Sequence, residues 1–118
     1  MQFSYRELAE IDALPHEDRL RRVYALWTVK EAYTKALGIG LGLDFSRIDV
    51  QLDATSSSVA AVCDDGVELH GWSFALLELE GNYLVAIASS VAAFDSRTVK
   101  SVLLEEMVAA SARGIEAT

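Results

Sequence analysis

Residues 27–42 read WTVKEAYTKALGIGLG, and this stretch decides where the helical part of the chain ends. Up to Leu37 the apolar residues recur every three or four positions, as they do on one face of an α-helix. Gly38 then predicts the end of the helix, because glycine readily takes the left-handed conformation that closes one. Upstream, the same spacing extends back to Ser4 with a break near Pro15, which suits the first turn of a new helix. The sequence therefore predicts a short helix and then a long one from Pro15 to Leu37.

After the glycines the apolar pattern shortens to a period of two, which is typical of β-strands. Four segments are rich in β-branched and aromatic residues and are separated by turn-forming residues. Gly81-Asn82 between the last two suits a two-residue hairpin turn, which needs positive φ at its tip. These features predict a three- to four-stranded antiparallel sheet, with strands at Arg47–Leu52, Val59–Cys63, Gly71–Glu80 and Tyr83–Val91.

A helical pattern returns from Ser96 to about Arg113, so residues 95–118 are expected to form a terminal helix and tail. Helices, then an antiparallel sheet, then a helix place the chain in the α+β class. The length of 118 residues and the hydrophobic content of 52% suit a single domain, residues 1–118, around one core.

The composition disfavours several classes of protein. The net charge of -8 argues against a nucleic-acid binder, because contact with phosphate backbones usually needs a basic surface. No apolar run approaches the roughly 20 residues of a membrane-spanning helix. The N-terminus lacks the layout of a secretory signal, and the single Cys63 cannot form an internal disulfide. The expected location is therefore the reducing cytoplasm.

The basic residues are concentrated in the first part of the chain. Residues 1–47 hold seven bases and seven acids, whereas residues 48–118 hold three bases and eleven acids. A compact anion such as a phosphate ester would find its cations in this charge-balanced part. A plain charged helix surface is the other interpretation of the same pattern.

Three charged residues of the long helix call for an explanation. At about 100° per residue, Glu31 and Lys30 fall within the wide apolar arc of the helix, and Lys35 lies at its edge. An ordinary Glu31–Lys35 pair on the helix surface would account for two of them. The functional alternative is a carboxylate that binds a hard cation, with two ammonium groups that bind phosphate oxygens carried by the same ion.

Residues 27–42 resemble the Trp-x-x-Lys-Glu-Ala/Ser-x-x-Lys-x-x-Gly-x-Gly-Leu signature of the 4'-phosphopantetheinyl transferases of the large, Sfp-like type. Phe3–Glu7 is similar to the family's Phe-Ser-x-x-Glu segment, and Arg47–Leu52 and Leu84–Ser89 resemble its final strands. The resemblance covers nearly all of residues 3–94. It implies the half-molecule fold of that family.

The resemblance also implies a reaction of the holo-[acyl-carrier-protein] synthase type. Such enzymes use Mg2+ and move phosphopantetheine from coenzyme A to a serine of an acyl or peptidyl carrier protein, so coenzyme A and a carrier protein become the expected partners. It implies Glu31 as the magnesium ligand and Lys35 as a contact of the coenzyme A phosphates. Lys30 would stabilise charge beside the pyrophosphate, and Glu7 would be the general base toward the carrier serine.

One part of the family pattern is missing from the sequence. Members carry a Gly-x-Asp-x-Glu strand upstream of these helices, whose acids complete the magnesium site. Asp49 lies in a segment that echoes this motif, but downstream of the helices, so it is not assigned to metal. Because one carboxylate makes a poor magnesium site, we expect the C-terminal half of a two-half transferase, with weak or no activity alone.

The missing half leaves three interpretations open. In the first, the partner of this chain is an N-terminal half that completes the enzyme. In the second, the chain is a non-catalytic module that binds coenzyme A or a carrier protein, with a second copy covering the exposed face in a homodimer. The third is a generic α+β interaction domain with no nucleotide ligand.

Overall fold

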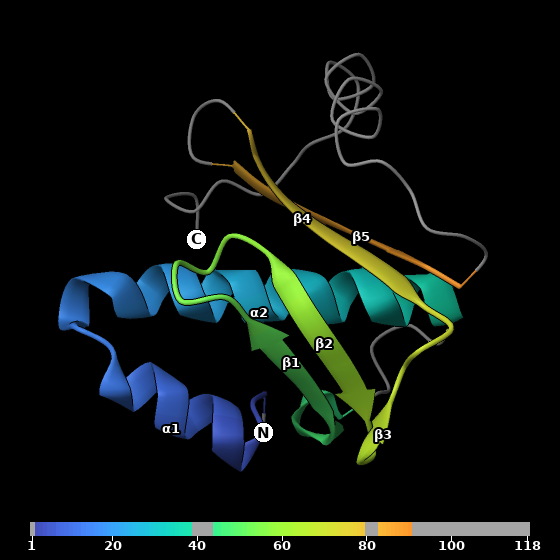
Figure 1. The fold of residues 1–118 in the computed structure, drawn as a ribbon, viewed down its shortest axis with the longest axis horizontal. Coiled ribbons are helices and arrows are strands. Elements are labelled where there is room, and N and C mark those ends of the chain that lie inside the picture. The colour runs from blue at the N-terminus through green and yellow to red at the C-terminus, as the bar shows by residue number, and fades with distance from the viewer. Residues whose placement is uncertain (1, 39–43, 80–82, 91–118) are drawn as a thin grey trace.

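The computed structural model describes residues 2–38, 44–79 and 83–90 of the chain. Within these residues two helices are followed by antiparallel strands (Figure 1). The elements are α1 (Tyr5–Ala13), α2 (His16–Leu37), a 3-10 turn at Phe45–Arg47, β1 (Ile48–Leu52), β2 (Val59–Asp64), β3 (Val67–Glu68), β4 (Ser73–Leu79) and β5 (Tyr83–Ser89). The α+β class is confirmed, and the predicted helix and tail at 95–118 lie outside the described residues.

Local capping explains where α1 begins and where α2 ends. At the start of α1 the Ser4 side chain accepts a hydrogen bond from the Glu7 backbone, and the Glu7 side chain accepts one from the Ser4 backbone. This reciprocal capping box satisfies two backbone donors that a helix start otherwise leaves unpaired. α2 begins at His16, one residue after the predicted start at Pro15, and Gly38 closes it with a left-handed φ of 74°, as predicted. The predicted short and long helices are therefore confirmed.

The strands within the described residues form two sheets instead of the single sheet of three to four strands that the sequence predicted. The first has the order β1-β2-β3, and the second consists of β4 and β5. Asp65 and Gly66, both with positive φ, make the two-residue turn between β2 and β3. After β3 a turn, in which the Trp72 backbone donates to the Leu69 carbonyl, separates β4 from the first sheet. At two residues, β3 is too short to show an alternating pattern.

The β4–β5 hairpin is confirmed as an antiparallel pair, with Leu79 opposite Tyr83. The predicted Gly81-Asn82 turn itself lies outside the described residues.

The core lies between α2 and the two sheets. Figure 1 shows α2 as the long helix that runs across the molecule, with β4 and β5 mostly above it and β1 below it in this view. The buried apolar side chains that pack together in this core come from both helices and from four strands, and they are Ile11, Ala25, Leu26, Val29, Tyr33, Ile48, Val50, Val62, Leu76 and Leu84. Burial of these side chains provides the main stabilisation of the fold. No helix in the described part of the chain has the length and apolarity needed to cross a bilayer.

Candidate functional site

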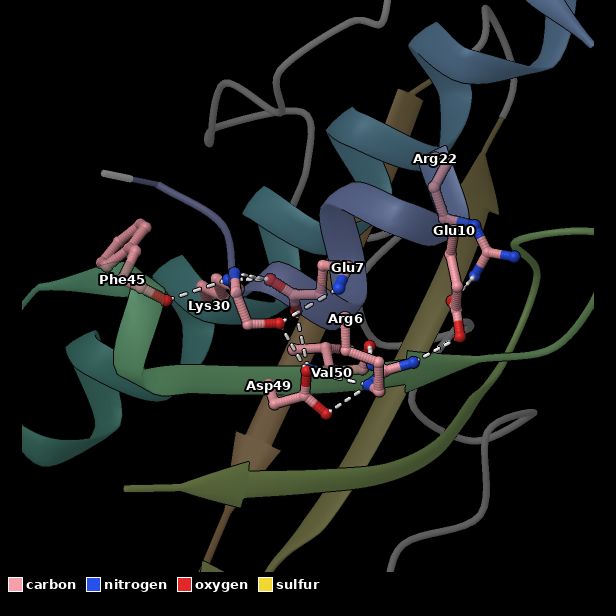
Figure 2. A network of polar contacts seen from close by, with 9 residues as sticks. Arg6, Glu7, Glu10, Arg22, Lys30, Phe45, Asp49 and Val50 are labelled. Atoms are coloured by element: carbon pink, nitrogen blue, oxygen red, sulfur yellow. Dashed lines mark hydrogen bonds and ion pairs between the residues drawn. The ribbon is translucent and has the colours of Figure 1, made fainter. Parts of the chain in front are cut away.

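Glu7 and Lys30 meet in the interior of the protein. The two side chains come from α1 and α2, both are 0% exposed, and Lys30 Nζ lies 2.5 Å from Glu7 Oε1 (Figure 2). The carboxylate also accepts hydrogen bonds from the Ser4 backbone at 2.9 Å and from the Val50 backbone at 2.7 Å. Glu7 therefore joins the start of α1, the long helix and the first strand in one buried contact.

All three hydrogen-bond donors of the Lys30 ammonium group have acceptors within the chain. Besides Glu7, Nζ donates to the Gln2 carbonyl at 3.0 Å and to the Phe45 carbonyl at 2.9 Å, and it lies 5.3 Å from the centre of the Phe3 ring. An ammonium has three donors, so all of them are occupied. Burial lowers the pKa of Lys30 below its usual value, while the Glu7 carboxylate acts in the opposite direction. In this conformation both side chains are buried and the Lys30 ammonium is held by contacts within the chain.

A second layer of polar contacts surrounds the buried pair. Asp49 accepts hydrogen bonds from Ser4 Oγ at 2.6 Å and from Arg6 Nε at 2.7 Å. Arg6 also donates to the Val50 carbonyl at 2.7 Å and pairs with Glu10 (Figure 2). Asp49, which echoes a metal-binding motif in the sequence, therefore anchors α1 to β1. These long-range contacts had no sequence signal beyond the Ser4–Glu7 capping box.

Glu31 and Lys35 differ from this buried group because their side chains are open to solvent. Glu31 is half-buried and Lys35 is exposed. The Glu31–Lys35 ion pair that sequence spacing allows does not form, and neither side chain makes a hydrogen bond or ion pair with another described residue. A carboxylate and an ammonium that lie one helical turn apart, each without a partner among residues 2–38, 44–79 and 83–90, can bind a cation and an anion on one face of α2.

The fit of Mg2+ to this face depends on Glu31. The described residues contain no group of three or more His, Cys, Asp or Glu side chains that could hold a metal ion. Magnesium prefers oxygen ligands and commonly takes only one or two from carboxylates, the rest coming from substrate phosphates and water. A half-buried carboxylate that pairs with no cation of the described residues therefore fits Mg2+ as one ligand among several.

Behind this face, α2 is tied to the first sheet through Asp64. The carboxylate accepts a hydrogen bond from Tyr33 Oη at 2.5 Å and one from Arg47 Nε at 2.7 Å. The Arg47 hydrogen bond lowers the pKa of Asp64 below its usual value, burial acts against it, and the Tyr33 hydroxyl lowers it further. Neither contact was visible in the sequence, because the partners lie 31 and 17 positions apart.

We expect Asp64→Asn to change the acid sensitivity of the fold. A carboxylate whose pKa is depressed by folding contributes stability above its unfolded pKa of about 4, and this contribution is lost as pH falls through the lower folded pKa. The variant should unfold at lower urea concentration than the wild type at pH 6, and the gap should narrow below about pH 4. Tryptophan fluorescence follows the transition. Asp12→Asn, which changes an exposed carboxylate, is the control and should unfold at the same urea concentration as the wild type. A difference in urea midpoint between Asp64→Asn and the wild type that stays constant down to about pH 3 would contradict the expectation.

Comparison with known proteins places this arrangement in a family. Residues 1–88 match the family model described as the 4'-phosphopantetheinyl transferase superfamily. The chain belongs to this superfamily. The family predicted from residues 27–42 is thus confirmed by a match over three quarters of the chain.

Several phosphopantetheinyl transferases of known identity share this segment. The 4'-phosphopantetheinyl transferase pptA of Paxillus involutus is 47% identical over 78 residues, which are 64% of this chain and 28% of that protein. The phosphopantetheinyl transferase of Thraustochytrium sp. is 39% identical over 74 residues, covering 63% of this chain and 24% of the relative. The holo-[acyl-carrier-protein] synthase of Streptococcus pyogenes serotype M1 is 32% identical over 82 residues, which are 69% of this chain and 66% of that protein. The chain thus spans less than a third of the first two relatives.

Proposed function

We propose that this chain is the coenzyme A-binding and magnesium-binding part of a phosphopantetheinyl transferase. The reaction would attach phosphopantetheine from coenzyme A to a serine of an acyl or peptidyl carrier protein. Membership of the superfamily supports the reaction class. The observation that carries the assignment of residues is that Glu31 and Lys35, one helical turn apart on α2, have no partner among the described residues.

Each of these two side chains has a role that matches its chemistry. Glu31 would give one oxygen to Mg2+, and the ion, when bound, stabilises negative charge on the pyrophosphate of coenzyme A. Lys35 would bind a phosphate oxygen of the same coenzyme A as a mobile point charge. The remaining ligands of the ion would come from the phosphates, from water, and from an N-terminal half or a second copy of the chain.

Glu7 and Lys30 take a positioning role in this proposal. Their buried ion pair holds α1, Phe45 and β1 against the middle of α2, directly before Glu31 in the sequence. A rigid supporting shell of this kind keeps ligand side chains in place. A general base at Glu7, or a pyrophosphate contact at Lys30, as the resemblance implies, would require the pair to open.

Calorimetry and a carrier-modification assay test the proposal together. We expect coenzyme A to bind this chain, more tightly with Mg2+ than without, whereas pantetheine, which lacks the phosphates, should not bind. With coenzyme A, Mg2+ and an apo carrier protein, the isolated chain should convert the carrier at least about 100-fold more slowly than the full-length product of its gene, because Glu31 alone gives the ion a single carboxylate and the other protein ligands would come from the second half. Mass spectrometry of the carrier reports the modification.

The outcomes distinguish the proposal from its alternative. Binding without carrier modification by the full-length product would support a non-catalytic module that binds coenzyme A. Absence of both would contradict the proposed function. Rapid turnover by the isolated chain would confirm the reaction but show that residues 1–118 need no further half.

A further inference from the structure

Tyr33 lies on the side of α2 opposite to Glu31 and Lys35. It is two positions from each of them, which corresponds to about 200° around a helix with 3.6 residues per turn. The burial agrees with this placement, because Tyr33 is 3% exposed while Lys35 is exposed and Glu31 is half-buried. Any contact that fixes Tyr33 therefore fixes the direction in which the two charged side chains point.

The hydroxyl of Tyr33 connects α2 to the first sheet. It donates to Asp64 Oδ2 at 2.5 Å, while Asp64 Oδ1 accepts from Arg47 Nε at 2.7 Å. Asp64 is the last residue of β2, where it pairs with Ile48 of β1 and with Val67 of β3. The hydrogen bond is thus made to the point where all three strands of the sheet are held together.

The ring of Tyr33 connects the same helix to the second sheet. Its centre lies 4.9 Å from that of Trp72 in an edge-to-face arrangement and 6.2 Å from that of Phe74, at the start of β4. Such aromatic contacts favour a defined geometry. One side chain therefore holds the last turns of α2 against both sheets. The hydroxyl fixes the rotation of α2 about its own axis, and the ring fixes the distance between α2 and the second sheet.

We propose that Tyr33 is a positioning residue whose hydrogen bond to Asp64 sets the orientation of Glu31 and Lys35 toward the magnesium complex of coenzyme A. This inference rests on the proposed function, because it assumes that these two side chains bind the complex. Ligands displaced by as little as about 1 Å lose much of their effect, so a contact on the far side of the helix can control binding.

Tyr33→Phe tests the inference, with Tyr24→Phe as a matched control. Both changes remove one phenol hydroxyl from α2, but the Tyr24 hydroxyl makes no hydrogen bond to a described residue. The ring contacts of Tyr33 remain in the phenylalanine variant, so the chain should fold. We expect amide hydrogens of residues 31–37 to exchange about tenfold faster in Tyr33→Phe and at the wild-type rate in Tyr24→Phe.

Binding of coenzyme A as a function of Mg2+ concentration provides a readout that general destabilisation would not move. In Tyr33→Phe the Mg2+ concentration for half-maximal binding should rise about three- to tenfold, because the ligand residue is less well held. Partial unfolding would lower the amount of bound coenzyme A without shifting that midpoint. Asp64→Asn keeps an oxygen acceptor for the hydroxyl and should behave more like the wild type, whereas Asp64→Ala should reproduce Tyr33→Phe.

The possible failures of the two proposals differ. If the wild type binds coenzyme A with Mg2+ and Tyr33→Phe matches it in midpoint and in exchange, the positioning role is overturned. If the wild type does not bind coenzyme A with Mg2+ at all, the proposed function fails, and the inference that Tyr33 orients Glu31 and Lys35 toward that complex fails with it. If Tyr24→Phe shows the same changes as Tyr33→Phe, the effect belongs to hydroxyl loss in general and the hydrogen bond to Asp64 has no special role.

Discussion

Replacing Lys30 by methionine is expected to lower the free energy of unfolding by about 3–5 kcal/mol, because it removes one partner of a buried ion pair. The change leaves the Glu7 carboxylate without its cation in a position that is 0% exposed. It also leaves the carbonyls of Gln2 and Phe45 without their donor. Since small domains have total stabilities of about 5–15 kcal/mol, this single change should populate the unfolded state.

Urea unfolding followed by tryptophan fluorescence measures the effect, and Lys35→Met is the matched control. Lys35 lies on the same helix but is exposed and unpaired among the described residues, so the same substitution there should cost well below about 1 kcal/mol. A loss for Lys30→Met no larger than for Lys35→Met would show that the pair does not hold the fold.

The double variant Glu7→Gln/Lys30→Met separates the ion pair from general damage to the core. If Lys30 acts through Glu7, the double variant should lose less stability than the sum of the two single variants, with a coupling energy of about 1–3 kcal/mol. Additive losses would indicate that Lys30 stabilises the chain mainly through the two carbonyls.

The parts of the fold that could be predicted from the sequence are those with local causes. The helix stop at Gly38 and the break near Pro15 each act on their nearest neighbours, and each was predicted from the pattern. The division into two sheets was not predictable in this way. It depends on a turn at residues 69–72, whose composition does not specify which strands pair.

The candidate site shows the same limit more sharply. The position of Lys30 around the helix correctly predicted a charge within the apolar arc. The angular positions of residues on one helix cannot show which side chain of another element pairs with that charge. Its partner Glu7 lies 23 positions earlier, and the contact between Tyr33 and Asp64 spans 31 positions. The arc also placed Glu31 inside the apolar face, whereas the side chain is half-buried, because the sheets do not cover the helix on that side completely.

The second large effect is expected at Glu31. Under the proposed function, Glu31→Gln in the full-length product of the gene should lower kcat/KM for carrier modification by about 100-fold or more, because the change would remove a charged oxygen ligand from the ion proposed to stabilise the pyrophosphate. Stability should barely change, since the Glu31 side chain makes no hydrogen bond or ion pair with a described residue. Glu17→Gln removes an exposed carboxylate from the other end of α2 and serves as the control.

The dependence of the rate on Mg2+ decides whether Glu31 acts through the metal. A ligand that is shortened but still charged, as in Glu31→Asp, should bind the ion less well, and raised Mg2+ should restore part of the lost rate. If Glu31 instead contacted a positive group of the carrier protein, loss of its charge would raise the KM for the carrier and leave the Mg2+ requirement unchanged. A near-normal rate for Glu31→Gln at low Mg2+ would remove this residue from the metal site, and the Glu31 carboxylate would then need a different partner.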